Sequence, residues 1–270
     1  MTDKREKIGF IGGGNMATAI IKGILHTQLL PAADVWVFDI SEERRKALGE
    51  MGCRVASSSV EIVDSCKYLL LAVKPQVIEG VLEEIAPRVT DNTVILSIAA
   101  GISCKYIRQK IGFDCKVVNV MPNTPLLMGS GTSALSRNEP IEEEEFQFAL
   151  KIFQSAGQAY VIPSQLMNEV IPLNSSSPAF IYYFAKIYVE RAEKAGFSRE
   201  LANELFCNTL IGSAKMMLES GLDHDTLLKM VTSPGGTTLK GLEAMDANGF
   251  RNAVEQGIDA CIQRAYELGK

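Results

Sequence analysis

The chain has 270 residues, of which 47% are apolar and 22% are charged, and its net charge is −5. This composition is typical of a globular protein with a sizeable core and excludes a disordered chain. The acidic balance gives no sign of a nucleic-acid partner, and no apolar run approaches the roughly 20 residues needed to span a bilayer. No small-residue cleavage site follows the charged start, so we expect no signal peptide and a cytoplasmic protein.

The reactive side chains exclude several classes of site. The six cysteines are widely spread, without a Cys-x-x-Cys pair, and His26 and His224 are the two histidines. A disulfide framework and a zinc site both need closer spacing, so we expect neither, and no other metal.

The first half of the chain alternates short apolar runs with helical stretches. Runs of Val, Leu and Ile without alternation indicate strands buried on both faces, and helices between them indicate parallel β-α-β units. We therefore predict a Rossmann-type α/β domain over residues 1–163. The expected strands are 7–11, 35–39, 68–73, 93–98, 116–120 and 158–162, and the expected helices are 15–25, 41–51 and about 76–85.

Four glutamates at 142–145 mark the start of a further helix. Acidic residues in a first turn are favoured by the helix dipole. We interpret this run as a solvated first turn in preference to an interaction patch.

The second half, residues 164–270, has no strand signals and is predicted to be an all-α domain. Its segment 179–189 is apolar around most of the helix circumference and must be buried on all sides. It is either a central core helix or part of a subunit interface. Ser198 is expected to cap the next helix and Gly221 to end it, and 239–269 is helical again.

A glycine motif follows the first expected strand. Gly12, Gly14 and Ala17 fit G-x-G-x-x-G/A and open a predicted helix, which is the context that dinucleotide binding requires. Gly12 allows a tight turn, and Gly14 lets the backbone approach a pyrophosphate at the helix N-terminus.

Asp39 ends the second expected strand, 25 residues after Gly14. A carboxylate there accepts hydrogen bonds from ribose hydroxyls and favours NAD. Ser41, Arg44 and Arg45 follow, and an arginine turned inward would hold the 2′-phosphate of NADP. Both NAD(H) and NADP(H) therefore stay open.

The sequence Ser-Pro-Gly-Gly-Thr-Thr at 233–238 breaks the helical pattern of the second half. Gly235 and Gly236 leave backbone amides open, and the following helix adds a positive dipole end, so the loop suits a carboxylate. Thr237 and Thr238 add hydroxyls. The alternative is a plain helix-helix turn in which one of these threonines is the N-cap.

These segments together resemble the pyrroline-5-carboxylate reductase family over nearly the whole chain. The resemblance rests on IGFIGGGNMA, LAVKPQ, SIAAGI, VMPNTP, GSAKMMLESG and above all the signature MVTSPGGTT, at 230–238. It implies a Rossmann domain followed by a helical domain that interleaves with a second copy into a homodimer, often assembled further into rings. It also implies NADH- or NADPH-dependent reduction of 1-pyrroline-5-carboxylate to L-proline, the last step of proline biosynthesis.

The resemblance assigns roles to individual residues. It implies that the amides of the loop hold the substrate carboxylate and that the Thr238 hydroxyl bonds the ring nitrogen, as the catalytic group. The implied substrate-binding residues are Ser233, Pro234, Gly235, Gly236, Thr237 and Thr238. The implied cofactor-binding residues are Ile11, Gly12, Gly13, Gly14, Asn15, Met16, Asp39, Ser41, Arg44, Ser59, Ala72, Val73, Lys74, Pro75, Ala100, Gly101, Met121, Pro122 and Asn123.

The chain departs from the family pattern at Asn119, where the family commonly has Arg, and at 175–177, which are three serines. Two other functions stay open. A β-hydroxyacid dehydrogenase-like enzyme needs a proton donor, for which Lys186 is the candidate by position, but the glycines around it are absent. A non-catalytic, dinucleotide-binding regulatory paralogue would have lost the threonines or the glycine pair, and both are intact.

Overall fold

The computed structural model describes residues 6–269. Its internal contacts divide the chain into two units. The first contains the described residues up to Ser176 together with those from Cys261 onward, and the second is Ser177–Ala260. Residues 164–176 and the end of the chain therefore group with the sheet, whereas the boundary expected from the sequence falls after residue 163.

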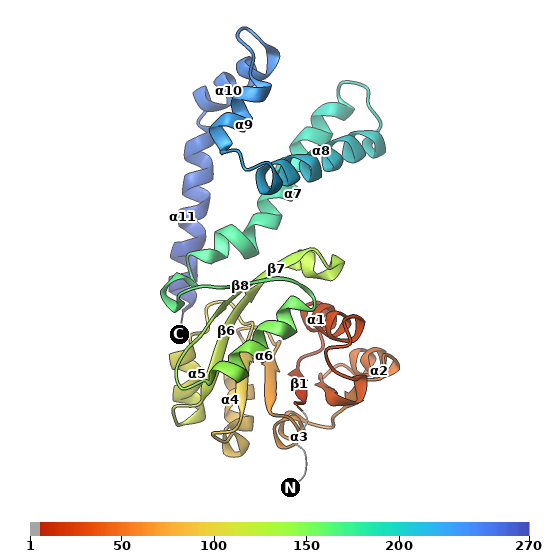
Figure 1. Ribbon diagram of the computed structural model, residues 1–270, viewed down its shortest axis with the longest axis vertical. Coiled ribbons are helices and arrows are strands. Elements are labelled where there is room, and N and C mark those ends of the chain that lie inside the picture. The colour runs from red at the N-terminus through yellow and green to blue at the C-terminus, as the bar shows by residue number, and fades with distance from the viewer. Residues whose placement is uncertain (1–5, 270) are drawn as a thin grey trace. The chain divides into compact units, whose positions relative to one another are not determined.

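Within residues 6–269, the first unit is built on an eight-stranded sheet (Figure 1). The strand order is β3-β2-β1-β4-β5-β6-β7-β8, and neighbouring strands are parallel except β6 and β7. The strands are β1 (Ile8–Ile11), β2 (Val35–Phe38), β3 (Arg54–Val55), β4 (Tyr68–Leu71), β5 (Val94–Ser97), β6 (Lys116–Pro122), β7 (Gly131–Ser136) and β8 (Gly157–Val161). The order reverses between β1 and β4, and such a switch point is where open α/β sheets bind ligands.

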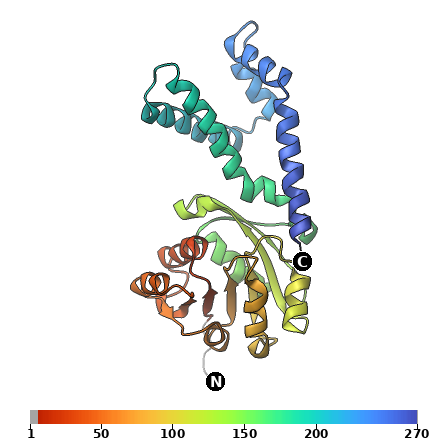
Figure 2. The same ribbon diagram turned by 180° about the vertical axis from the view of Figure 1, so that it is seen from behind.

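Helices cover both faces of this sheet, which is why β1, β4 and β5 are buried at every position. One face packs against α1 (Asn15–His26), α2 (Glu42–Glu50) and α6 (Glu143–Gln154). The other packs against α3 (Ser59–Ser65), α4 (Ile78–Ile85) and α5 (Cys104–Ile111). Figure 2 shows α4 and α5, in gold and yellow, from behind.

The predicted parallel sheet domain is confirmed, and every strand and helix expected for it is present with ends that shift by at most two residues. The sequence did not single out β3, β7, α3 or α5. Strand β3 has only two residues, and β7 is a run of small residues that pairs antiparallel with β6. Neither offers the continuous apolar run by which the other strands were found.

Helix α6 begins with the glutamate run, and its solvated-turn interpretation is wrong for one residue. Glu143 and Glu144 are exposed, but Glu145 is only 4% exposed and lies 3.1 Å from Lys67 Nζ and 2.8 Å from Lys116 Nζ. Burial by itself would raise the pKa of Glu145, but hydrogen bonds from Lys116, the Glu142 backbone and Lys67 outweigh it, and the pKa is lowered. This carboxylate ties α6 to the amino-terminal ends of β4 and β6.

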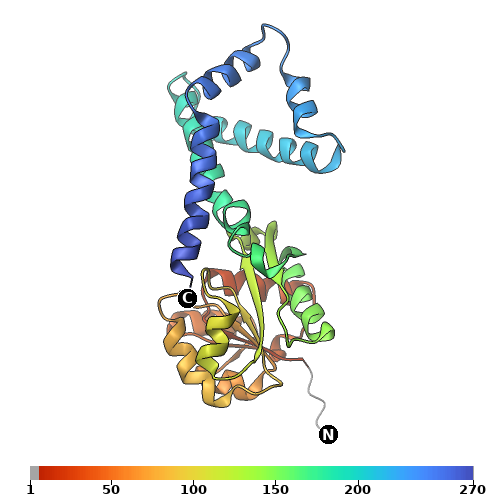
Figure 3. The same ribbon diagram turned by 90° about the vertical axis from the view of Figure 1, so that its left-hand side faces the viewer.

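The second unit is helical (Figure 3). It contains α7 (Ser177–Glu193), α8 (Arg199–Glu219), α9 (His224–Val231), α10 (Thr237–Ala247) and the first part of α11 (Phe250–Leu268). Ser198 caps α8 by accepting the Leu201 N–H at 3.2 Å, and Gly221 follows α8 with φ +71°, as expected. Along residues 6–269, no helix combines the length and the apolar character of a membrane span.

Helix α7 carries large apolar and aromatic side chains that this chain does not bury. Tyr183 is 66% exposed, and Phe180, Ile181, Tyr182 and Ile187 are also exposed. The interpretation of 179–189 as a central core helix is therefore wrong. An exposed apolar surface of this kind marks an interaction site, which leaves the subunit-interface interpretation. Large apolar side chains are also exposed on α8 and α9, namely Leu205, Ile211, Met217, Leu218, Met230 and Val231.

Candidate functional site

The glycine loop between β1 and α1 lies at the point where the strand order reverses. Gly12 has φ +103°, and its amide donates to the Phe38 carbonyl at 2.8 Å. A Cβ on Gly12 would lie 2.5 Å from the Ala72 carbonyl oxygen. Only glycine fits this turn, because both the backbone angle and the neighbouring strand exclude a side chain. The predicted tight turn is confirmed.

Gly14 has the opposite surroundings, since a Cβ there would meet no atom within 4 Å. It is the N-cap of α1, with no side-chain cap. The first amides of a helix have no partner within the helix, and the dipole adds a partial positive charge. Open space above uncapped amides fits the pyrophosphate of a dinucleotide, which Gly14, Asn15 and Met16 would hold.

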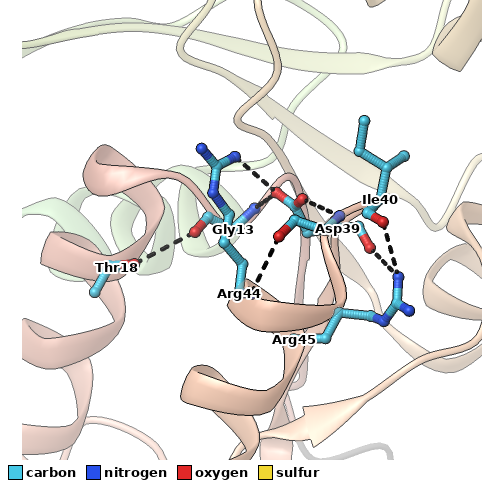
Figure 4. A network of polar contacts seen from close by, with 7 residues as sticks. Gly13, Thr18, Asp39, Ile40, Arg44 and Arg45 are labelled. Atoms are coloured by element: carbon cyan, nitrogen blue, oxygen red, sulfur yellow. Dashed lines mark hydrogen bonds and ion pairs between the residues drawn. The ribbon is translucent and has the colours of Figure 1, made fainter.

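Asp39 braces the glycine loop from the end of β2 (Figure 4). Its Oδ2 accepts the Gly13 N–H at 2.7 Å, and its Oδ1 accepts the Ser41 N–H at 2.8 Å. The Arg44 guanidinium lies 3.4 Å from Oδ2. Burial would raise the pKa of Asp39, but the two backbone hydrogen bonds and Arg44 outweigh it and lower that pKa. The Gly13 amide is thus occupied by Asp39, and contacts of Gly13 to a cofactor would have to use other atoms.

The guanidinium of the next residue, Arg45, is hydrogen-bonded to main-chain carbonyls. Arg45 Nη1 donates to the Asp39 carbonyl at 2.5 Å and to the Ile40 carbonyl at 3.3 Å. Ser41 caps α2 by accepting the Arg44 N–H at 3.4 Å, and Ile40 is almost fully exposed. The turn after β2 is therefore a fixed structure around Asp39.

The other cofactor-binding residues expected from the sequence gather at the same edge of the sheet. Strands β1, β4, β5 and β6 run parallel, with Ile11, Leu71, Ser97 and Asn119 in register. Their carboxyl ends bring the expected groups to one side, as open α/β sheets do around a ligand. These groups are Ala72, Val73, Lys74 and Pro75 after β4, Ala100 and Gly101 after β5, and Met121, Pro122 and Asn123 at the end of β6.

Two of the expected residues turn their side chains to the protein. Ser59 is buried, and its hydroxyl donates to Glu84 at 3.3 Å, so in this structure it offers no surface to an adenosine ribose. Asn123 accepts the Thr132 N–H at 2.9 Å and donates to Asn174 Oδ1 at 3.2 Å. The role that the structure shows for Asn123 is to hold the loop after β6.

Asn174 has no signal in the sequence and is a positioning residue for this edge. It lies in a π-helical turn, Ile171–Ser176, and its Nδ2 donates to the Met121 carbonyl at 2.6 Å. The next residue, Ser175, donates from its hydroxyl to the Pro122 carbonyl at 3.1 Å. Rare π-helical turns are frequent at functional sites, and this one fixes the backbone at the end of β6.

A cavity of about 380 Å³ opens at the carboxyl ends of β5 and β6. Its lining includes Gly101, Asn119 and Met121, and also Asn168 and Tyr266. The residue by which the chain departs from the family pattern, Asn119, thus faces a space beside expected cofactor-binding residues.

The loop 233–238 lies between α9 and α10 in the second unit, visible as the turn between the two short blue helices of Figure 3. Gly235 has φ +73°, and the Gly236 N–H donates to the Ser233 carbonyl at 2.9 Å. Gly236 is the N-cap of α10 and provides no side-chain cap. The alternative with Thr237 or Thr238 as N-cap is therefore wrong, because both lie inside the first turn.

The threonine hydroxyls of this loop are available to a ligand. Thr237 and Thr238 are exposed, and no hydrogen bond found among residues 6–269 involves either hydroxyl. The first amides of α10 lack a side-chain cap, as in α1. The loop thus presents backbone amides, a positive dipole end and two hydroxyls together.

Comparison with known proteins decides the family. The pyrroline-5-carboxylate reductase of Escherichia coli is 34% identical over 267 residues, covering 98% of this chain and 99% of that protein. The Pseudomonas aeruginosa enzyme is 36% identical over 266 residues, with 98% and 97% covered. The chain belongs to the pyrroline-5-carboxylate reductase family.

The two halves match separate family descriptions. Residues 164–268 match pyrroline-5-carboxylate reductase dimerisation, and residues 7–101 match NADP oxidoreductase, coenzyme F420-dependent. Among solved structures, Plasmodium falciparum pyrroline carboxylate reductase with NADP bound has a TM-score of 0.91 and 27% identity, with 99% of each chain covered. The Coxiella burnetii reductase has a TM-score of 0.90 and 29% identity, with 98% and 99% covered. The resemblance and the fold class inferred from the sequence are confirmed.

The candidate proton donor of the β-hydroxyacid dehydrogenase-like alternative has another partner. Lys186 lies on the exposed surface of α7 and pairs with Glu190 at 3.5 Å. Within the described part of the chain, no three His, Cys, Asp or Glu side chains gather into a metal-binding group.

Proposed function

We propose that this protein is a pyrroline-5-carboxylate reductase, which reduces 1-pyrroline-5-carboxylate to L-proline with NADH or NADPH as the last step of proline biosynthesis. The observation that carries this proposal is the loop 233–238, with its uncapped amides and free hydroxyls at the start of α10. The near full-length relatives that bear this name support it.

The loop binds the substrate through its carboxylate. The amides of Thr237, Thr238 and Leu239 point out of the first turn of α10, and the helix dipole favours a negative charge there. Gly235 supplies the left-handed backbone angle that lets the chain enter the helix in this way. A glycine N-cap keeps these amides open, whereas a serine or aspartate would occupy one of them.

Thr238 orients the ring nitrogen. The substrate is a cyclic imine that is a good electrophile once protonated, so the protein needs to fix its orientation and provide one hydrogen-bonding group at nitrogen. The Thr238 hydroxyl accepts the N–H of the protonated imine, and that proton stays on nitrogen as the amine forms. A bound reduced nicotinamide supplies the hydride to the imine carbon.

The first unit holds the dinucleotide. Gly14, Asn15 and Met16 receive the pyrophosphate at the start of α1, and Asp39 lies beside the adenosine ribose. The segments 72–75, 100–101 and 121–123 line the nicotinamide end. Asn174 acts on this site through the Met121 carbonyl.

The protein works as a homodimer. The exposed apolar surface of α7, α8 and α9 is the surface that a second copy covers. Assembly of dimers into a larger ring, and a cytoplasmic location, are further predictions.

Absorbance of the reduced nicotinamide tests the function. Purified protein with pyrroline-5-carboxylate should oxidise NADH, NADPH or both, and proline should accumulate in proportion. The same protein with a panel of β-hydroxyacids and either oxidised dinucleotide should give no signal. Turnover of a hydroxyacid would favour the dehydrogenase alternative, and binding of a dinucleotide without any turnover would favour the regulatory paralogue.

A further inference from the structure

The turn after β2 bears on whether the adenosine ribose carries a 2′-phosphate, a choice that family membership leaves open. We infer that Asp39 makes this protein prefer NADH to NADPH, because its buried carboxylate is fixed beside the ribose and meets the 2′-phosphate with a like charge. The inference rests on the proposed dinucleotide site and deepens it by naming the residue that selects the cofactor.

The position of the carboxylate follows from the glycine loop. Asp39 Oδ2 lies 2.7 Å from the Gly13 nitrogen, one residue before the N-cap of α1. A pyrophosphate on the first turn of α1 is joined to the adenosine ribose through a single methylene group. The ribose hydroxyls of a dinucleotide held there therefore come within reach of Asp39.

The carboxylate has room for ribose hydroxyls without losing its structural role. An ionised carboxylate accepts about four hydrogen bonds, and Asp39 receives three contacts, from Gly13, Ser41 and Arg44. The Arg44 contact is the longest, at 3.4 Å, and comes from a side chain that is 58% exposed. A ribose hydroxyl takes the remaining acceptor position on Oδ1, and the contacts with Gly13, Ser41 and Arg44 all remain.

The carboxylate of Asp39 is fixed in position and stays ionised. Two backbone amides hold the carboxylate in place, so it does not rotate away, and its side chain is only 5% exposed. The same hydrogen bonds oppose the effect of burial and lower the pKa of Asp39, so it stays ionised at neutral pH. A 2′-phosphate, itself an anion at that pH, is repelled at close range.

The neighbouring arginines do not reverse this balance. Figure 4 shows the Arg44 guanidinium on the Gly13 side of Asp39 and the Arg45 guanidinium beside Ile40. Arg45 is held by two main-chain carbonyls. Arg44 already compensates the charge of Asp39, and moving it to a phosphate would leave that carboxylate without its cation.

Direct binding measures the preference without any turnover. Dissociation constants for NADH and NADPH are determined by calorimetry on the wild type and on Asp39→Asn, Asp39→Ser and Glu43→Gln. The wild type should bind NADH at least about tenfold more tightly than NADPH, which corresponds to a 1.4 kcal/mol difference. Both Asp39 variants should remove most of this ratio, chiefly by tightening NADPH.

Glu43→Gln is the matched control, since it removes one negative charge from an exposed position in the first turn of α2, four residues after Asp39, and should change the ratio by less than about twofold. The wild-type ratio stands as a test even if an Asp39 variant fails to fold. Equal or tighter binding of NADPH to the wild type would overturn the inference, as would an unchanged ratio in folded Asp39→Asn or Asp39→Ser. If the wild type preferred NADPH and Arg44→Ala lost that preference, Arg44 would be the residue that selects the cofactor.

The result is separable from the proposed function. NADH selectivity that depends on Asp39, in a protein that does not turn over pyrroline-5-carboxylate, would uphold this inference and refute the reductase. Turnover with a strict NADPH requirement would do the opposite.

Discussion

Two glycine loops, one in each unit, use the same device at a helix N-terminus. Helices α1 and α10 begin at Gly14 and Gly236, with extended backbone angles and no side-chain cap. In contrast, α2, α3, α5, α8 and α9 begin at a serine or aspartate whose side chain accepts a first-turn amide. A glycine N-cap leaves those amides open to an anion, for which we propose a pyrophosphate in one unit and a carboxylate in the other.

The loops differ in what holds them. The first is enclosed by the Ala72 carbonyl and braced by the buried Asp39. The second is mostly exposed and is held by its own turn, from the Gly236 N–H to the Ser233 carbonyl. The sheet of the same chain therefore shapes the first loop. The second loop belongs to a unit whose apolar surfaces are exposed in a single chain.

The largest expected effect comes from the enclosed loop. Gly12→Ala should destabilise the fold by about 3 kcal/mol or more and abolish dinucleotide binding, because it adds backbone strain and a clash with Ala72. Gly14→Ala is the matched control for folding, since its Cβ enters open space. It should leave the melting temperature unchanged and weaken NADH binding about tenfold by crowding the phosphate. Normal stability and binding in Gly12→Ala would contradict the role of the turn.

A charged residue on the exposed face of α7 should impair the function of the second loop and leave that of the first loop intact. Tyr183→Glu should weaken self-association about 100-fold, because it buries an unpaired charge in the interface. Light scattering measures this change. In the resulting monomer, kcat/KM for the substrate should fall while NADH binding by the first unit persists.

Tyr160→Glu is the control for this charge, because Tyr160 is 56% exposed but lies on β8 in the first unit. It should leave the oligomer intact. A wild-type protein that is monomeric at micromolar concentration would contradict the proposed interface.

Changes in the second loop should affect the substrate alone. Thr238→Ala removes one oriented hydrogen bond, worth roughly 1–3 kcal/mol, so kcat/KM should fall about 10- to 100-fold. Gly236→Val should be worse, because its Cβ would lie 2.6 Å from Ser233 Oγ and distort the amide nest. NADH affinity should stay at the wild-type value in both variants.

Thr232→Ala is the control for the hydroxyl, since Thr232 donates to the Leu228 carbonyl at 2.8 Å and should retain activity. Binding of proline reports directly on the loop. If Thr238→Ala and Gly236→Val weakened NADH binding and left proline binding unaffected, the loop would not be the carboxylate site.

The smallest expected effect lies at the end of the sheet away from the glycine loop. Glu145→Gln should lower the free energy of unfolding by roughly 1–2 kcal/mol at pH 7, because it removes the ion pairs with Lys67 and Lys116. The loss stays small because both lysines are partly exposed and regain some hydration. NADH affinity should not change.

The pH dependence of this effect has a definite sign. The pKa of Glu145 is lowered in the fold, so its contribution is complete above the ordinary value of 4.5 and is lost as the pH falls through the folded pKa. Denaturant unfolding should show a constant difference between wild type and Glu145→Gln above that value and a narrowing difference below it. A difference that widens in acid would contradict the ion pairs.

Local patterns in the sequence determined the order of the β-α units, the glycine turn at Gly12 and the helix break at 233–238. Each depends on residues that are neighbours in the chain: a continuous apolar run, or Gly12 and Gly14 between a strand and a helix. The resemblance added the family, and the comparisons confirmed it. These are the features that short-range sterics and backbone hydrogen bonding specify.

Only the tertiary structure decided the features that depend on residues far apart in the sequence. The Gly13 amide meets Asp39 across 26 residues, Asn174 meets Met121 across 53, and Lys116 meets Glu145 across 29. No local pattern in the sequence indicates such a distant partner. For this reason the sequence did not distinguish the buried Glu145 from the exposed members of the same glutamate run. The apolar helix α7 is the converse case, because its sequence required burial and the fold of one chain does not provide it.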